Sequence, residues 1–180
     1  MGYGVVTTAA VSRDPVNGKP ERTHHTLTQP ADSRLTAAVR LIECGVVRTR
    51  SSESLAVRLG TLFDGVTALI ERHRPDAVAV EGLFHGRNAR SALILGHARG
   101  VVLLAATRAG LPVAEISPAE VKRAVTGTGA ATKAQVAAMV KRLLNLVAAP
   151  KPADAADGVA IALTHLLRLR PGARMSVGRR

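Results

Sequence analysis

Short apolar segments and longer amphipathic segments alternate along this chain. The clearest amphipathic block is 54–73, where apolar residues recur every three or four positions, as on one face of a helix, and Pro75 follows it. Further helices are predicted at 88–109, at 118–125 behind a Ser117–Glu120 capping box, at 132–144 and at 153–169. Short strands are predicted at 2–6, 40–49, 76–81 and 112–116. Strands followed by alternating strands and helices predict an α/β domain with a mixed sheet.

Residues 7–39 keep neither the helical nor the strand period. They hold three prolines and an Asn17-Gly18 pair, which are typical of turns. We therefore predict a single domain over 1–170 with a long loop insertion at 7–39. The basic end of the chain, 171–180, is expected to be a flexible tail.

Composition and charge narrow the class of protein. Apolar residues make up 47% of the chain, which excludes a disordered protein, and the single cysteine excludes a disulfide scaffold or a cysteine-rich zinc module. No signal peptide or membrane span is evident, so a cytoplasmic protein is expected. The net charge of +12 favours an anionic partner such as nucleic acid. An arginine-rich proteome would give the same excess, so charge alone leaves this open.

Few acids are present, and Glu81 is placed unusually among them. It ends the apolar strand at 76–81 and precedes Gly82. Ligands of α/β folds bind at the carboxyl ends of such strands. A functional carboxylate is one interpretation, and a strand-end acid that simply reaches water is the other.

Asp154 and Asp157 begin an apolar helix, and their spacing places both carboxylates on one face. Either acid alone would suit the positive end of the helix dipole. As a pair without a basic neighbour at helical spacing, they suggest a bound cation, and carboxylate oxygens favour Mg²⁺ or Mn²⁺. A basic surface for phosphate and an acidic cluster for metal together suit a nuclease.

Several ordered blocks of the chain carry a family pattern. The blocks are Val78–Phe84, Asn88–Leu93, Leu95–Gly100, Glu120–Gly129, Lys133–Val136 and Pro152–Ala162. Together they resemble RuvC-type Holliday junction resolvases over about 40–168, with the first few residues in addition. The resemblance implies a ribonuclease H-like fold, in which helices flank a five-stranded mixed sheet.

The resemblance also implies a homodimeric DNA endonuclease of recombination and repair. It would nick opposed strands of a four-way junction symmetrically and work with the RuvA–RuvB branch-migration complex. Glu81, Asp154 and Asp157 would be catalytic and would hold two Mg²⁺ ions per subunit, or Mn²⁺. A metal-activated water would then leave 5′-phosphate and 3′-hydroxyl ends.

Other residues match DNA-contacting positions of the family. Phe84 would stack on an unpaired base, and Lys122 and Lys133 would contact DNA near the scissile phosphate. Arg87 and Arg90 are weaker candidates for backbone contacts. Ordinary core packing of Phe84 and a solvated helix face for the lysines are the alternatives, and His165 is expected in the core or behind the ligands.

The chain departs from the family pattern at its start. The family's first strand, which ends in the first catalytic Asp, has no counterpart before Gly2. Without this central strand the sheet would be open in its middle, with two unpaired edges. We expect a truncated chain with three of four carboxylates, weak or absent cleavage and retained junction binding.

Three other functions remain possible at this stage. A module of the same fold could bind branched DNA without cutting it. A YqgF-type ribonuclease H-like nuclease would act on RNA. A basic structural or ribosomal protein is the third, although such proteins rarely end an apolar strand on a lone acid.

Overall fold

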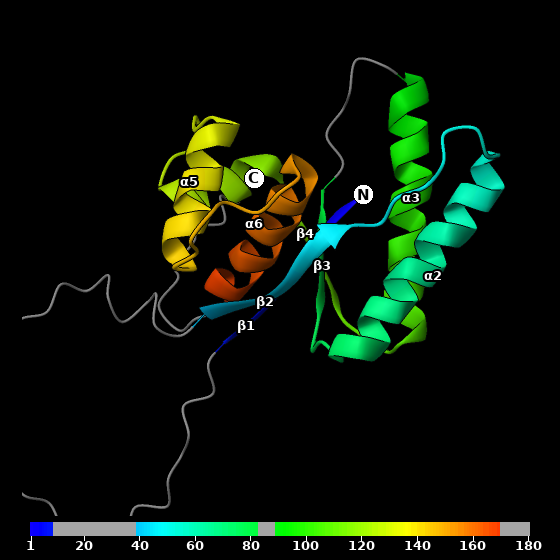
Figure 1. Cartoon of the computed structure of the whole chain (residues 1–180), viewed down its shortest axis with the longest axis horizontal. Helices are drawn as coiled ribbons and strands as arrows, with labels where there is room; N and C mark the ends of the chain where they lie inside the picture. Colours follow the sequence, from blue (N-terminus) through cyan, green and yellow to red (C-terminus); the bar gives the residue numbers. More distant parts are fainter. Residues whose placement is uncertain (9–38, 83–88, 170–180) are drawn as a thin grey trace, which may run out of the picture.

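Helices lie on both sides of the strands, so the fold has three layers (Figure 1). The structure is a computed structural model and describes residues 1–8, 39–82 and 89–169. One outer layer consists of α2 (Leu55–His73) and α3 (Ala89–Arg108). The other consists of α4 (Pro118–Thr126), α5 (Lys133–Leu143) and α6 (Ala153–Arg168).

The described part of the chain contains four strands, which form two separate pairs. β1 (Gly2–Thr8) and β2 (Val39–Val46) are antiparallel, whereas β3 (Val78–Glu81) and β4 (Val113–Ile116) are parallel. The predicted mixture of strand directions is therefore present. Within the described residues each strand pairs along one edge only, so no ladder joins the two pairs into one sheet.

Helix α6 packs against all four strands and so holds the two pairs in one domain. Its buried residues Val159, Ala160 and Leu163 belong to the same core as Ile116 at the end of β4. A second core lies between β3, β4 and the α2–α3 layer, with Leu62, Val66, Val80, Val102 and Ala105 buried in it. Burial on both faces explains why β3 is apolar from Val78 through Val80.

Glycine allows β1 to lie directly on α6. A Cβ atom on Gly4 would stand 2.6 Å from the Val159 Cα, and one on Gly158 would stand 2.7 Å from the Tyr3 Cα. A Cβ on Gly2 would collide with the Asp154 carbonyl. Any side chain at these positions would push strand and helix apart. Gly2 contacts Asp154 and Gly4 contacts Val159, so the residue numbers rise together and β1 runs in the same direction as α6.

The predicted helix boundaries lie within one residue of those in the structure, whereas the strand boundaries are corrected, among them the start of β3, which is Val78 and not residue 76. The Ser117–Glu120 capping box is present, and Gly127 ends α4 at φ 80°. Ser54 is the N-cap of α2, and its side chain accepts from the Val57 amide. The loop predicted at 7–39 is shorter in the structure. Antiparallel pairing extends β1 through Thr8, two residues into the predicted loop, and begins β2 at Val39, the last residue of the predicted loop. β2 also ends at Val46, three residues before the predicted end of the strand.

Helix α3 is long and apolar enough to cross a membrane by length and composition, and only 17% of its 18-residue window is buried. One such helix is weak evidence for a span. Arg99, in the middle of α3, pairs with Glu115 of β4, which ties the helix to the parallel strands. The exposed apolar side of α3 is therefore a surface of a folded domain.

Candidate nuclease site

Glu81 and the two aspartates of α6 lie at the same end of the fold. Glu81 is exposed at the carboxyl end of β3, and the next residue, Gly82, donates its amide to the Ile116 carbonyl at 2.8 Å. Asp154 is exposed in the first turn of α6, where no side chain caps the helix. Its place in the first turn agrees with the helix-dipole alternative as well as with a metal-binding role.

Asp157 faces a cation from a neighbouring helix. The Lys133 ammonium donates to the Asp157 Oδ2 at 3.2 Å, with the side chains 84% and 47% exposed respectively. Lys133 is the first residue of α5, and a capping box fixes that turn: Thr132 Oγ1 accepts from the Gln135 amide, and Gln135 Oε1 accepts from the Thr132 amide. The two predicted site residues are thus in direct contact.

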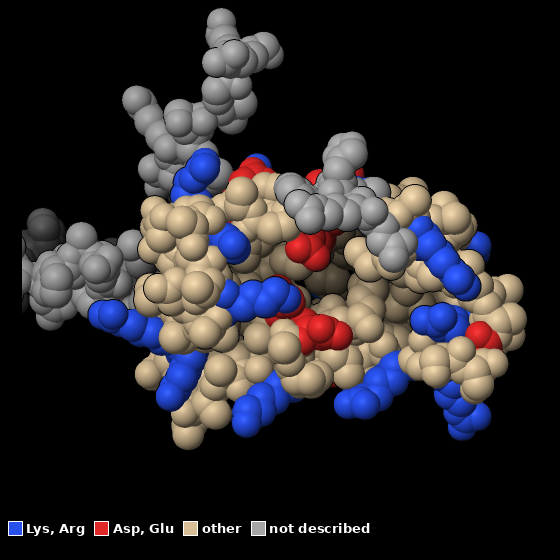
Figure 2. Space-filling view, turned by 90° about the horizontal axis from the view of Figure 1, so that it is seen from above, with Lys and Arg blue, Asp and Glu red and all other residues tan. Residues whose placement is uncertain are grey.

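The electrostatics of Lys133 link all three acids. The pKa of Lys133 is raised, chiefly by the hydrogen bond and charge of Asp157, and further by the charges of Glu81 and Asp154. Figure 2 shows acidic side chains gathered about a hollow on this face, with basic side chains over the surrounding surface. Such an arrangement attracts a cation to the acidic side chains and phosphate to the basic surface around them.

The side chains of Glu81, Asp154 and Asp157 are of the type that binds a hard divalent cation, but they do not form a complete set of ligands. All three are carboxylates, the oxygen donors that Mg²⁺ and Mn²⁺ prefer. The Lys133 ammonium demonstrates that a positive charge is favoured beside them. Within residues 1–8, 39–82 and 89–169, no three acidic, histidine or cysteine side chains approach closely enough to hold one ion.

The remaining predicted residues are spread around this centre. Lys122 is partly buried on α4, and Arg90 is exposed in the first turn of α3. Phe84 and Arg87 lie outside the described residues. His165 is partly buried on α6, and burial, with the charge of Arg168, lowers its pKa. That position agrees with the predicted role in the core rather than as a ligand.

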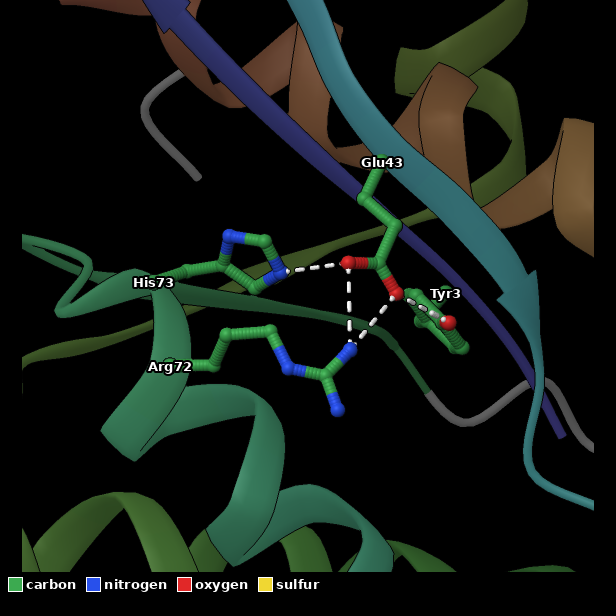
Figure 3. A network of polar contacts seen from close by, with 4 residues as sticks. All are labelled: Tyr3, Glu43, Arg72 and His73. Carbon is green, nitrogen blue, oxygen red and sulfur yellow. Dashed lines mark hydrogen bonds and ion pairs between the residues drawn. The ribbon is translucent and has the colours of Figure 1, made fainter.

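A second polar cluster, which the sequence analysis did not predict, joins β1, β2 and α2 (Figure 3). Glu43 accepts hydrogen bonds from the Tyr3 hydroxyl at 2.7 Å and from Arg72 at 3.3 Å, and His73 Nε2 lies 2.8 Å from it. The hydrogen bond from Tyr3, then that from His73, lowers the pKa of Glu43. The only sign of this cluster in the sequence is Glu43 itself, an acid on an apolar strand. Its partners Tyr3 and His73 are 40 and 30 residues away along the chain.

Comparison with known proteins identifies the family of this chain. The family described as crossover junction endodeoxyribonuclease RuvC matches residues 31–165. A crossover junction endodeoxyribonuclease RuvC of Frankia alni is 50% identical over 137 residues, which are 76% of this chain and 70% of the relative. One of Chlorobaculum parvum is 47% identical over 147 residues, 82% of this chain and 76% of the relative.

Solved structures agree. The RuvC structure of Thermus thermophilus matches with a TM-score of 0.72 and 38% identity, over 93% of this chain and 87% of the other. The structure of T. thermophilus RuvC in complex with Holliday junction substrate matches with a TM-score of 0.67 and 40% identity, over 72% and 80% of the two chains. The predicted ribonuclease H-like class is thereby confirmed, and the chain belongs to the RuvC family of crossover junction endodeoxyribonucleases.

Proposed function

We propose that this protein binds four-way DNA junctions and that Glu81, Asp154 and Asp157 form the acidic part of its nicking site. The observation that carries the proposal is the contact of Lys133 with Asp157, because it brings a phosphate-binding cation and a metal-binding carboxylate to one point. The relative whose structure was solved in complex with Holliday junction substrate supports the choice of substrate. The sequence blocks and the folding of three acids to one end favour this over a basic structural protein.

In this proposal the three carboxylates hold Mg²⁺, with Mn²⁺ as a substitute and two ions per subunit. The metal supplies an activated water for attack on the phosphodiester. Lys133 and Lys122 bind phosphate oxygens, Arg90 and Arg87 contact the DNA backbone, and Phe84 stacks on an unpaired base. The negative charge of the carboxylates also repels the DNA phosphates until bound cations screen that charge.

We further propose that the 180-residue chain binds junctions but cuts them weakly or not at all. The three acids do not form a three-ligand group among the described residues, and no ladder joins the β1–β2 pair to the β3–β4 pair there. An ordered nicking site needs its ligands held within a fraction of an ångström. Two unconnected strand pairs provide less rigid support than a continuous sheet.

The test is a nicking assay on a synthetic four-way junction with Mg²⁺, beside a gel-shift assay of binding. The chain is expected to prefer the junction to a linear duplex and to cut little; robust cutting would contradict the proposed inactivity. A chain extended before Met1 by an apolar strand ending in Asp-Pro-Gly should cut. In that background Glu81→Ala and Asp157→Ala are expected to abolish cutting and spare binding.

Matched substitutions separate the alternatives. Asp76→Asn removes an exposed acid outside the proposed site and should leave cutting in the extended chain unchanged. A fall in binding equal to the fall in cutting would make Glu81 or Asp157 structural. Preference for structured RNA over the junction in competition would favour the YqgF-type alternative, and an extended chain that binds but never cuts would favour a binding module.

We also propose a homodimer that forms through α3. Leu93, Leu95 and Leu104 are 63%, 60% and 52% exposed, and Gly96 and Gly100 leave open space between them. Leu93, Gly96, Gly100 and Leu104 fall on one helical stripe, and a contiguous exposed apolar patch marks a protein–protein surface. Leu104→Asp should shift the protein to monomer in sedimentation, while Val147→Asp, at a 97% exposed loop position, should not.

Two wider assignments follow from family membership. We propose that the dimer works in the cytoplasm and that it meets the RuvA–RuvB branch-migration complex on the junction. Co-purification of both proteins on immobilised four-way junctions, but not on duplex, would test the second assignment.

A further inference from the structure

Lys133 differs from an ordinary surface lysine in how its backbone is held. The Thr132–Gln135 capping box fixes the first turn of α5, with hydrogen bonds of 3.2 and 2.8 Å. Only the side chain is free to move, and 84% of it is exposed. The ammonium nevertheless lies 3.2 Å from the Asp157 Oδ2. A fixed base and a long flexible stem let one cation reach more than one anion within a limited radius.

The position of the ammonium also matters. The Lys133 ammonium contacts Asp157 directly, and the charges of Glu81 and Asp154 act on it as well. Carboxylates brought together repel one another unless a cation lies among them. The ammonium therefore offsets the same repulsion that a divalent ion would offset.

We propose that Lys133 is a resident counter-ion of the acidic site, which competes with the divalent cation for Asp157 and turns to the DNA phosphate when the cation takes that carboxylate. This inference rests on the metal-binding role of Asp157 proposed above. It adds that one residue couples the binding of metal to the binding of DNA.

The exposure of the pair decides how strong this competition can be. Exposed ion pairs contribute little free energy, so Lys133 is a weak competitor that exchanges readily, equivalent to about a two- to five-fold change in affinity. Coupling between two ligands is reciprocal, so DNA that draws Lys133 away should also tighten metal binding. Lys133 then acts as a positioning residue whose partner depends on what is bound.

The experiment measures Mn²⁺ binding to the full chain by electron paramagnetic resonance of the free ion, without DNA. Lys133→Gln is expected to bind Mn²⁺ about two- to five-fold more tightly than wild type. Asp157→Asn should bind it more weakly, and Lys133→Arg should restore the wild-type affinity. In the double variant, the gain from Lys133→Gln should vanish because the contested carboxylate is gone.

Lys141→Gln is the matched control. It removes the same charge from the same helix, eight residues on, about 12 Å along the axis. At 0.15 M salt this is beyond the screening length of about 8 Å, so its Mn²⁺ affinity should change much less. An equal gain in both variants would assign the effect to overall charge and overturn the inference.

The outcomes separate this inference from the proposed function. If Asp157→Asn loses Mn²⁺ but Lys133→Gln gains nothing, the resident counter-ion is wrong and the metal site stands. If Asp157→Asn binds Mn²⁺ as wild type does, both fail. Added junction DNA should tighten Mn²⁺ binding more in wild type than in Lys133→Gln, and an equal change in both would also contradict the coupling. Circular dichroism melts check that each variant is folded.

Discussion

Helices α6 and α3 are both apolar, but they use their apolar side chains differently. In α6, Ala155 and Val159 are completely buried and Leu163 is 1% exposed, because the helix lies against all four strands. In α3, Leu93 and Leu104 stay largely exposed. The first helix completes its packing within the chain, and the second leaves a face for another molecule. Apolar content therefore predicts burial only when the partner surface is known.

The largest difference between two matched substitutions should come from glycines, one at the contact between β1 and α6 and one in α3, because their effects have opposite signs. Gly4→Ala places a Cβ 2.6 Å from the Val159 Cα, so strand and helix must separate, and we expect a loss of about 2–3 kcal/mol in the free energy of unfolding. Gly100→Ala in α3 meets open space and should gain about 0.5–1 kcal/mol. Urea denaturation measures both. Equal effects would show that β1 does not pack on α6 as closely as described.

Leucine truncation sharpens the same contrast. Leu163→Ala removes a buried side chain from the main core and should cost about 2–4 kcal/mol. Leu104→Ala removes one that is 52% exposed and should cost less than about 1 kcal/mol in the monomer. The comparison is made by urea denaturation at a protein concentration where the chain is monomeric. A large monomer loss for Leu104→Ala would mean that α3 is buried within the chain after all.

The smallest effect concerns the polar cluster that holds β1 and β2 to α2. The folded-state pKa of Glu43 is lowered, so its contribution is present above its ordinary pKa near 4.5 and is lost as the pH falls through the folded value. Glu43→Gln should cost about 1 kcal/mol at pH 7 and flatten the loss of stability below pH 5. Exposed Glu71 serves as the control: Glu71→Gln should keep the wild-type pH profile. Thermal melts between pH 3 and pH 7 decide between these outcomes.

Local signals in the sequence predicted most of the elements. The period of 54–73 and the Ser117–Glu120 box act over one or two turns, so they can be read without knowing the fold. Strand ends are set by the partner strand. The extension of β1 to Thr8 depends on Val39, 31 positions along the chain, and no local signal contains it.

The site divides in the same way. The spacing of Asp154 and Asp157 and the place of Glu81 at a strand end could be read locally. The contact of Lys133 with Asp157 could not, because it depends on how α5 packs against α6. The Glu43 cluster joins three elements and was missed for that reason. Whether the three acids hold metal stays a prediction.

The position of the amino terminus has a practical consequence. Met1 exchanges hydrogen bonds with Val47 through its ammonium and its carbonyl, and Gly2 lies against Asp154 (Figure 1). An affinity tag fused before Met1 would therefore emerge beside the acids, and a polyhistidine tag would bring metal-binding imidazoles to the place where Mn²⁺ is to be measured. Purification tags for this protein belong at the carboxyl end, or must be removed completely before any metal titration.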